Sequence, residues 1–342
     1  MISDTVASPI VAILQFVWDN FGKKIVAEGS KWGWKAAQWK VAADRYDRRL
    51  EEDYGKLFVL GQPDPKPIDD IYTYVEILDR VTAFKRHAPE ELETLFVGRG
   101  LLYQREERQD GLKLVQTGDN LFILGKPGAG KTTFLKQVII RAANGKLSRV
   151  VDNNLRALLP KKYQTTKEVT QIPIFISLRA HADSGRSLFE SVEHELKICR
   201  FPEAAPFVKY LLKSGRALVL LDGLDEVKQD EDERRRLIEA IHDFMREYRE
   251  TQFLITCRVA AADYSLDNVR YLEMADFDDE QKHLFVYRWF EDSDMARQCW
   301  EELEQPENEG LRELARVPLL LTLLAITYEE TLDNIGNKIF AF

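Results

Sequence analysis

The stretch of sequence that decides the fold is Leu121–Thr133, which reads Leu-Phe-Ile-Leu-Gly-Lys-Pro-Gly-Ala-Gly-Lys-Thr-Thr. Its opening residues are apolar and β-forming, and they predict a buried strand. The glycine-rich residues that follow match the pattern G-x-x-x-x-G-K-S/T, and Thr132–Ala143 has the composition of a helix. A strand, a glycine-rich loop and a helix in this order are the context in which this pattern indicates a phosphate-binding loop.

The residue types in the loop suit the binding of a polyphosphate. Glycines let the backbone wrap around phosphates with its N–H groups pointing inward, and the N-terminus of the following helix adds partial positive charge. We expect Lys131 to reach the β- and γ-phosphates and the Thr132 hydroxyl to ligate Mg²⁺. The predicted nucleotide-binding residues of the loop are Gly125, Lys126, Pro127, Gly128, Ala129, Gly130, Lys131, Thr132 and Thr133.

A second apolar run ends in acidic residues. Ala217–Leu221 is apolar throughout, and Asp222-Gly223-Leu224-Asp225-Glu226 follows it. Because ligands of parallel α/β sheets bind at the carboxyl ends of the strands, we expect Asp222 to contact Mg²⁺ directly or through a water molecule. Either Asp225 or Glu226 is predicted to orient or deprotonate the attacking water, and the sequence does not choose between them.

An arginine follows a third apolar run. Phe253–Thr256 leads directly into Cys257 and Arg258. A guanidinium at the carboxyl end of a strand, beside a phosphate-binding loop, can contact a γ-phosphate and report its presence. Arg258 is therefore predicted to be a catalytic residue that senses the γ-phosphate.

The remaining pattern predicts the fold class. Ile172–Leu178 is a further candidate strand, and Leu188–Arg200 and Glu231–Tyr248 are candidate helices between strands. Strands that alternate with helices predict βαβ units and a parallel sheet covered on both faces. Right-handed crossovers then limit the topology to a doubly wound sheet. We predict an α/β P-loop NTPase fold with a doubly wound parallel sheet, an N-terminal helical region and a C-terminal small helical domain.

The division of the chain into domains follows from the same pattern. We expect an N-terminal helical region over residues 1–92, the nucleotide-binding domain over 93–275 and a small helical domain over 276–342. The helices predicted in the last of these are Gln281–Phe290, Met295–Leu303 and Leu311–Tyr328. The apolar stretch Val6–Trp18 is too short to span a bilayer, so we expect no transmembrane segment and interpret the stretch as a core helix or a partner-facing helix.

Charge and cysteine content argue against nucleic acid as the main partner and against a cysteine metal site. The formal net charge is −9, and residues 273–342 hold 6 Lys or Arg against 17 Asp or Glu. A protein that holds nucleic acid by its phosphates normally shows a basic stripe, so nucleic acid is disfavoured as the main partner. The three cysteines are far apart and match no metal-ligand spacing, which is typical of reduced thiols in a cytoplasmic protein.

Four motifs together resemble the NACHT family of STAND P-loop ATPases, which are multi-domain signal-transducing proteins. The motifs are Gly125–Thr133, the D-G-L-D-E of Asp222–Glu226, the T-C-R of Thr256–Arg258, and the L-A-R-V-P-L-L-L of Leu314–Leu321. A glycine after the first aspartate, with an acidic pair two residues later, separates this family from ordinary AAA+ proteins and helicases. The resemblance covers about residues 95–328.

The resemblance implies a switch controlled by ATP and ADP with Mg²⁺. ADP would keep the protein closed, and exchange for ATP would open it and allow self-association, with slow hydrolysis, in signal transduction such as antiviral defence. By this likeness Pro318 packs against the adenine, and the segment Val97-Gly98-Arg99 caps the base. An effector or sensor protein would be the partner. Family members continue into a winged-helix domain, so the end at Phe342 implies a chain truncated after the first helical domain.

Two other functions stay open at this point. A conventional AAA-like ATPase that remodels protein or nucleic acid would show robust turnover stimulated by a polymer, and the lack of a basic stripe argues against a nucleic-acid track. A non-hydrolysing adaptor would instead bind a partner through the helix around Ile10–Trp18. In that case, variants at Asp225 or Glu226 that still bind nucleotide would keep full function.

Overall fold

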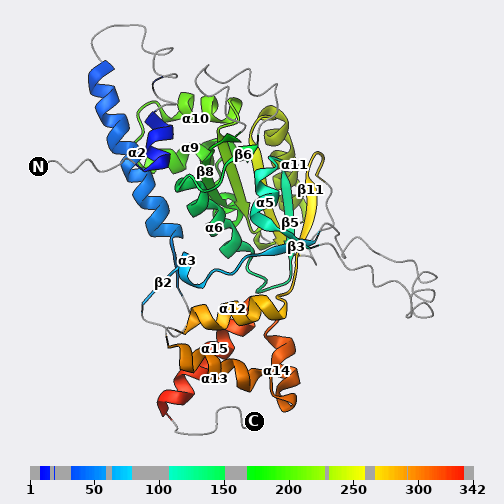
Figure 1. Cartoon of the computed structure of the whole chain (residues 1–342). Helices are drawn as coiled ribbons and strands as arrows, with labels where there is room; N and C mark the ends of the chain where they lie inside the picture. The colour runs from blue at the N-terminus through cyan, green and yellow to red at the C-terminus, as the bar shows by residue number, and fades with distance from the viewer. Residues whose placement is uncertain are drawn as a thin grey trace, which may run out of the picture.

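A seven-stranded sheet with helices on both faces forms the upper part of the molecule, and a small helical bundle lies below it (Figure 1). The computed structural model describes residues 8–15, 19, 32–58, 64–78, 108–150, 168–227, 231–258, 266–290 and 292–334. Among these residues, no helix is both long enough and apolar enough to cross a membrane.

The central sheet is mostly parallel. In sheet order, its strands are β4 (Arg108–Asp110), β3 (Glu76–Leu78), β11 (Arg270–Met274), β5 (Leu121–Gly125), β10 (Gln252–Arg258), β9 (Ala217–Asp222) and β8 (Ile172–Ser177). The strands from β11 to β8 are parallel, while β3 and β4 add an antiparallel edge next to β11. The predicted α/β fold with a parallel sheet is therefore confirmed. The short strand pairs β1 (Lys56–Leu57) with β2 (Lys66–Pro67), and β6 (Arg149–Val150) with β7 (Glu168–Val169), lie outside this sheet.

The helices cover both faces of the sheet because the chain reverses direction across it. Helix α6 (Lys131–Ala143) carries the chain from β5 to the edge strand β8, and the later helices return it through β9 to β10. Right-handed crossovers in opposite directions place these two groups on opposite faces. The returning helices are α8 (Leu178–Ser184), α9 (Leu188–Ile198), α10 (Ala204–Lys213) and α11 (Glu231–Glu247), and the short α5 (Gly111–Gln116) precedes β5.

The N-terminal helices pack against the sheet domain. Helix α2 (Trp32–Tyr54) runs alongside the β8 edge (Figure 1), where the Tyr46 hydroxyl donates to the Pro173 carbonyl at 2.6 Å. Residues 9–15 form a short helix whose Ile10 and Leu14 are fully buried in the main core. That burial favours a core helix over a partner-facing one for this segment, while the expected continuation through residues 16–18 lies outside the described residues.

The small helical domain has its own core. It contains α12 (Asp279–Trp289), α13 (Ser293–Leu303), α14 (Glu309–Leu314) and α15 (Pro318–Asn334), with the 3₁₀ turn η5 (Pro306–Asn308) before α14. The sequence predicted one helix over Leu311–Tyr328, and this was wrong: the chain breaks between α14 and α15. Pro318 has no N–H and restricts the residue before it, so it begins a helix rather than continuing one.

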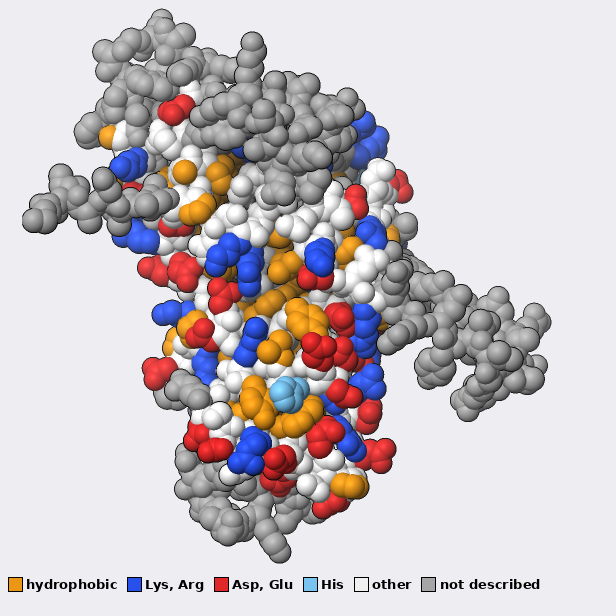
Figure 2. All heavy atoms as spheres, viewed as in Figure 1, with side chains coloured by type: hydrophobic (Ala, Val, Ile, Leu, Met, Phe, Trp, Pro, Cys, Tyr) orange, Lys and Arg blue, Asp and Glu red, His pale blue; other side chains and the backbone are white. Residues whose placement is uncertain are grey.

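A short segment links the two parts of the molecule. It contains α3 (Ile68–Ile71) and the extended residues 72–75, and it leads into β3. Tyr72 belongs to the core of the sheet domain, whereas Ile71 belongs to that of the helical domain. We call residues 64–75 the connecting segment. The small helical domain also carries the acidic excess of the sequence, visible as red side chains in the lower part of Figure 2.

Candidate functional site

The glycine-rich loop has the backbone conformation that its glycines permit. Gly128 and Gly130 have φ angles of +76° and +88°, in the left-handed region that side chains with a Cβ rarely adopt. The loop is closed by a hydrogen bond of 3.2 Å from the Ala129 N–H to the Lys126 carbonyl, and Lys131 then begins α6. The amides of the loop therefore meet the N-terminus of a helix, which is an arrangement that attracts anions.

Lys131 lies across the mouth of this loop. Its Nζ donates to the Gly125 carbonyl at 2.8 Å and to the Lys126 carbonyl at 3.1 Å. Burial lowers the pKa of Lys131; the carboxylate of Asp225 opposes this effect and the guanidinium of Arg258 adds to it. Among the described residues, this half-buried ammonium group is bonded only to neutral carbonyls. It is well placed to pair with a phosphate, because an anion would compensate the charge that burial disfavours.

Three side chains, one each from α6, β9 and β10, form one hydrogen-bonded group. The Thr132 hydroxyl donates to Asp222 Oδ2 at 2.8 Å, and the Thr256 hydroxyl donates to Asp222 Oδ1 at 2.5 Å. The Gly223 N–H in turn donates to Thr256 Oγ1 at 2.9 Å. Both carboxylate oxygens of Asp222 are thereby fixed in direction. Hydroxyl and carboxylate oxygens held together beside a phosphate loop are the hard ligands that Mg²⁺ prefers, so the residues present fit the metal.

The two candidates for a catalytic acid have different surroundings. Both oxygens of Asp225 accept from Arg258, Oδ1 from the backbone N–H and Oδ2 from Nε, each at 2.8 Å. The neighbouring Glu226 is exposed and lines the same cavity, and no described residue bonds to its carboxylate. The structure therefore places Asp225, Glu226 and Arg258 together, with only the carboxylate of Glu226 open to a water molecule.

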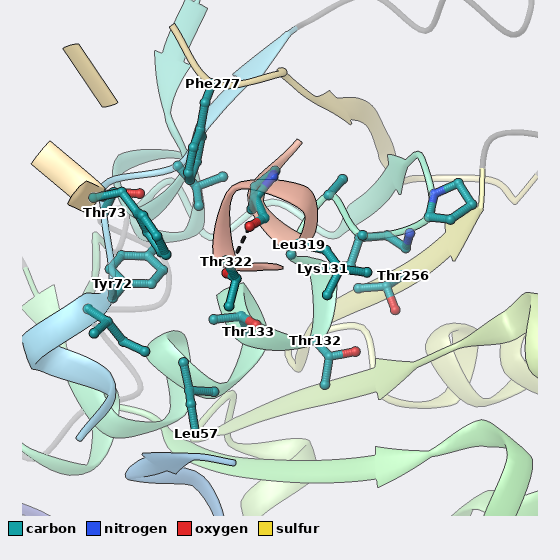
Figure 3. Close-up of a pocket in the computed structure, with 18 of the residues that line it drawn as sticks. Leu57, Tyr72, Thr73, Lys131, Thr132, Thr133, Thr256, Phe277, Leu319 and Thr322 are labelled. Atoms are coloured by element: carbon teal, nitrogen blue, oxygen red, sulfur yellow. Dashed lines mark hydrogen bonds between the residues drawn. The ribbon is translucent and has the colours of Figure 1, made fainter. Parts of the chain in front are cut away.

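A cavity of about 550 Å³ connects the loop to the small helical domain. Figure 3 shows Lys131, Thr132 and Thr256 on one side of it and Tyr72, Thr73 and Phe277 on the other. The second side is mostly apolar, as a nucleobase pocket requires. Its lining includes Leu57, Phe58, Ile71, Tyr72, Thr73, Val75, Phe277, Phe285, Trp289, Leu323 and Ile326. Hydrophobic side chains are also visible in the middle of the view in Figure 2, between its upper and lower parts.

Most of this apolar wall was not found from the sequence. The region Ile68–Arg86 has a mixed pattern that allows either a strand or a helix. The structure makes residues 68–78 a short helix, an extended segment and a strand, and the rest of the region lies outside the described residues. Pro318 does line the cavity, which leaves its expected contact with adenine a prediction. The segment Val97-Gly98-Arg99, expected to cap the base, lies outside the described residues.

The comparisons with known proteins agree with this geometry. The sequence profile of the NACHT domain matches residues 119–293, slightly more than half of the chain. The chain belongs to the NACHT family. The matched region runs from just before β5 through α12 to the first residue of α13, and so contains the loop, Asp222 and Arg258. The protein is therefore a P-loop NTPase of the NACHT type, and its site is one that binds a nucleotide with Mg²⁺ in such proteins.

Other comparisons add little to the NACHT assignment. No curated protein gives a significant match. Among solved structures, the chain is similar to AMPPCP-bound DnaA from Aquifex aeolicus, with 16% sequence identity and a TM-score of 0.29. That similarity covers 73% of this chain and 68% of DnaA. At this level of similarity, no function is carried over from DnaA.

Proposed function

We propose that this NACHT protein is an ATPase that acts as a nucleotide-dependent switch. ADP would hold the small helical domain against the phosphate loop, and ATP with Mg²⁺ would release it and allow copies of the chain to associate. The setting we propose is cytoplasmic signalling in defence or stress, with an effector or sensor protein as partner. One observation carries the proposal: the Leu319 N–H, in the first turn of α15, donates to the Gly128 carbonyl of the loop at 3.2 Å.

Two further polar contacts lie near this hydrogen bond, one made by the loop and one within the helical domain. Lys126 Nζ pairs with Asp276 Oδ2 at 2.7 Å, just before α12. The Phe277 N–H donates to the Arg316 carbonyl at 2.8 Å, which ties the entrance of α12 to the end of α14. A change in loop geometry on binding or losing a γ-phosphate would therefore act directly on the position of α15. Such a direct mechanical link is what a two-state element requires.

The connecting segment gives the helical domain a second contact beside the cavity. Gln281 Nε2 of α12 donates to the Tyr74 carbonyl at 2.7 Å, Arg288 donates to the Tyr72 carbonyl, and Lys66 Nζ donates to the Trp289 carbonyl at 3.0 Å. The same segment reaches the sheet domain through Asp69, which accepts from Gln137 of α6 at 2.9 Å. A nucleotide in the cavity would thus touch the loop, the segment and the helical domain together.

The side chains of the site divide the chemistry between them. Lys131 would neutralise phosphate charge, and Thr132 with Asp222 would hold Mg²⁺, which when bound neutralises and orients the phosphates. Glu226 would accept a proton from the attacking water, because its carboxylate is the open one. This role requires the carboxylate to be ionised when the water binds. Slow turnover fits a switch, since each nucleotide state then lasts long enough for a partner protein to respond to it.

The proposed switch predicts a nucleotide-dependent mass. We expect the purified protein to contain ADP and to form a larger assembly when Mg·ATP is added. The measurements are the mass in solution by light scattering after gel filtration and the nucleotide content of the denatured protein. A monomer that does not change with nucleotide, with fast exchange and brisk turnover, would instead indicate an ordinary ATPase.

The variant Gly128→Ala is expected to weaken the contact between the loop and α15. Its Cβ would lie 2.8 Å from Cβ of Leu319, at a residue whose φ is +76°. The left-handed conformation alone costs a side chain about 1–2 kcal/mol, so we expect a lower melting temperature and a smaller shift on adding ADP. Thermal unfolding with and without ADP measures both. The control is Gly310→Ala, since nothing lies within 4 Å of a Cβ there; equal behaviour of the two variants would contradict the coupling.

A further inference from the structure

The ion pair between Asp225 and Arg258 is a two-point contact at the edge of the cavity. The carboxylate accepts from both the backbone N–H and the Nε of the arginine, each at 2.8 Å. The side chain of Asp225 is only 8% exposed, whereas that of Arg258 is 52% exposed. The aspartate is therefore fixed by its surroundings, and it fixes in turn the direction of a guanidinium group that reaches into the cavity.

The arginine keeps part of its hydrogen-bonding capacity for a ligand. A guanidinium carries five N–H donors, and the pairing with Asp225 uses only the one on Nε. No described residue accepts from the two terminal nitrogens of Arg258, and the side chain lines the cavity together with Lys131 and Thr132. These terminal nitrogens suit the oxygens of a phosphate, which they can bind in a bidentate manner.

Strand order explains why this contact exists at the site. Strand β10 lies between β5 and β9, with Arg258 opposite Gly125 at the start of the loop. The 3₁₀ turn η3 (Leu224–Glu226) follows β9 directly, so its acids lie next to the end of β10. Two residues of β10 therefore contact the end of β9 and the turn that follows it. Thr256 donates to Asp222, and Arg258 pairs with Asp225.

We infer that Asp225 is a positioning residue that aims Arg258 at the terminal phosphate of a nucleoside triphosphate, and thereby sets the preference of the site for ATP over ADP. This inference rests on the proposed function, because it assumes that the cavity binds these nucleotides. Asp225 acts through Arg258 rather than on the attacking water, since both of its oxygens are engaged. Its loss therefore affects the triphosphate and leaves the diphosphate almost unchanged.

The experiment measures this preference as the ratio of the Kd for ADP to the Kd for a β,γ-methylene analogue of ATP. Both are measured in Mg²⁺ by displacement of a fluorescent ADP from the full chain. We expect Asp225→Asn to lower the ratio about tenfold, since charge-assisted hydrogen bonds to one phosphate are lost. Arg258→Met is expected to lower it by a similar factor. Asp225→Ser is measured as well, because it removes the ion pair with a smaller side chain.

A double-mutant cycle separates positioning from an independent role. If Asp225 acts through Arg258, the Asp225→Asn change has no further effect on the ratio in the Arg258→Met background. Asp53→Asn is the matched control, because Asp53 also pairs with an arginine Nε, that of Arg49, at 3.1 Å, and neither residue lines the cavity. Its ratio is expected to equal that of the unmutated chain.

Two results would overturn the inference while leaving the proposed function standing. One is an unchanged ratio in both Asp225 variants with tight binding of each nucleotide; the other is additive effects in the double variant. An unmutated chain that binds neither nucleotide would instead remove the proposed function, and the inference with it.

Discussion

Lys131→Ala is expected to weaken the binding of Mg·ADP and Mg·ATP by about 100-fold, because charge-assisted hydrogen bonds to phosphate contribute about 1.5–3 kcal/mol each. The Nζ of Lys131 lies 2.8 Å from the Gly125 carbonyl at the mouth of the loop, and burial already lowers the pKa of Lys131. Removing the side chain leaves the loop amides without their cationic neighbour. Displacement of a fluorescent ADP measures the loss.

The matched control for this prediction lies on the same helix. Lys136 is also in α6, but it does not line the cavity, so Lys136→Ala is expected to bind nucleotide as the unmutated chain does. Full ATP affinity in the Lys131 variant would remove the assignment of the phosphate loop. A similar loss in both variants would point to damage to α6 rather than to a lost phosphate contact.

Glu226→Gln is expected to slow ATP hydrolysis by about 100-fold or more, in the range usual for the loss of a general base. The exposed carboxylate of Glu226 lines the cavity and has no bonding partner among the described residues. An amide of the same shape cannot accept a proton, so binding should be spared while turnover falls. Single-turnover hydrolysis at saturating ATP, together with the Kd for ADP, measures the two effects separately.

Glu239→Gln provides the comparison for this second prediction. Glu239 is exposed on α11 and does not line the cavity, and its loss should change neither rate nor affinity. Unchanged turnover in Glu226→Gln would show that Glu226 is not the base. If Asp225→Asn then abolished hydrolysis while Arg258→Met did not, Asp225 would take that role, which would also contradict the positioning role inferred above.

Several parts of the fold and the site could be predicted from the sequence because their signals are local. The loop needs glycines at particular backbone angles, and two of them do adopt left-handed values. The apolar runs that became β5, β8, β9 and β10 are buried on both faces, which leaves a continuous hydrophobic signature. The position of Asp222 at the end of β9 was predictable for the same reason, and its expected contact with Mg²⁺ stays a prediction.

Other features were not predictable because their signals are weak or divided along the chain. Strand β11 was missed, and Arg270–Met274 carries an arginine and a glutamate that weaken its apolar pattern. The antiparallel edge of β3 and β4 is formed by three-residue strands, too short for a period of two to be detected. The break before Pro318 was missed because an amphipathic helical pattern precedes it and a strongly apolar one follows it.

The sequence by itself determined the parallel α/β sheet, the phosphate loop and the family to which the chain belongs. It could not decide between Asp225 and Glu226, because that choice depends on which strand lies beside β9. Only the tertiary structure placed β10 between β5 and β9 and so paired Asp225 with Arg258. It also brought Tyr72 and Thr73 into the cavity, on the side opposite Lys131 and Thr132. Such contacts join residues far apart in the chain, and packing, rather than local propensity, decides them.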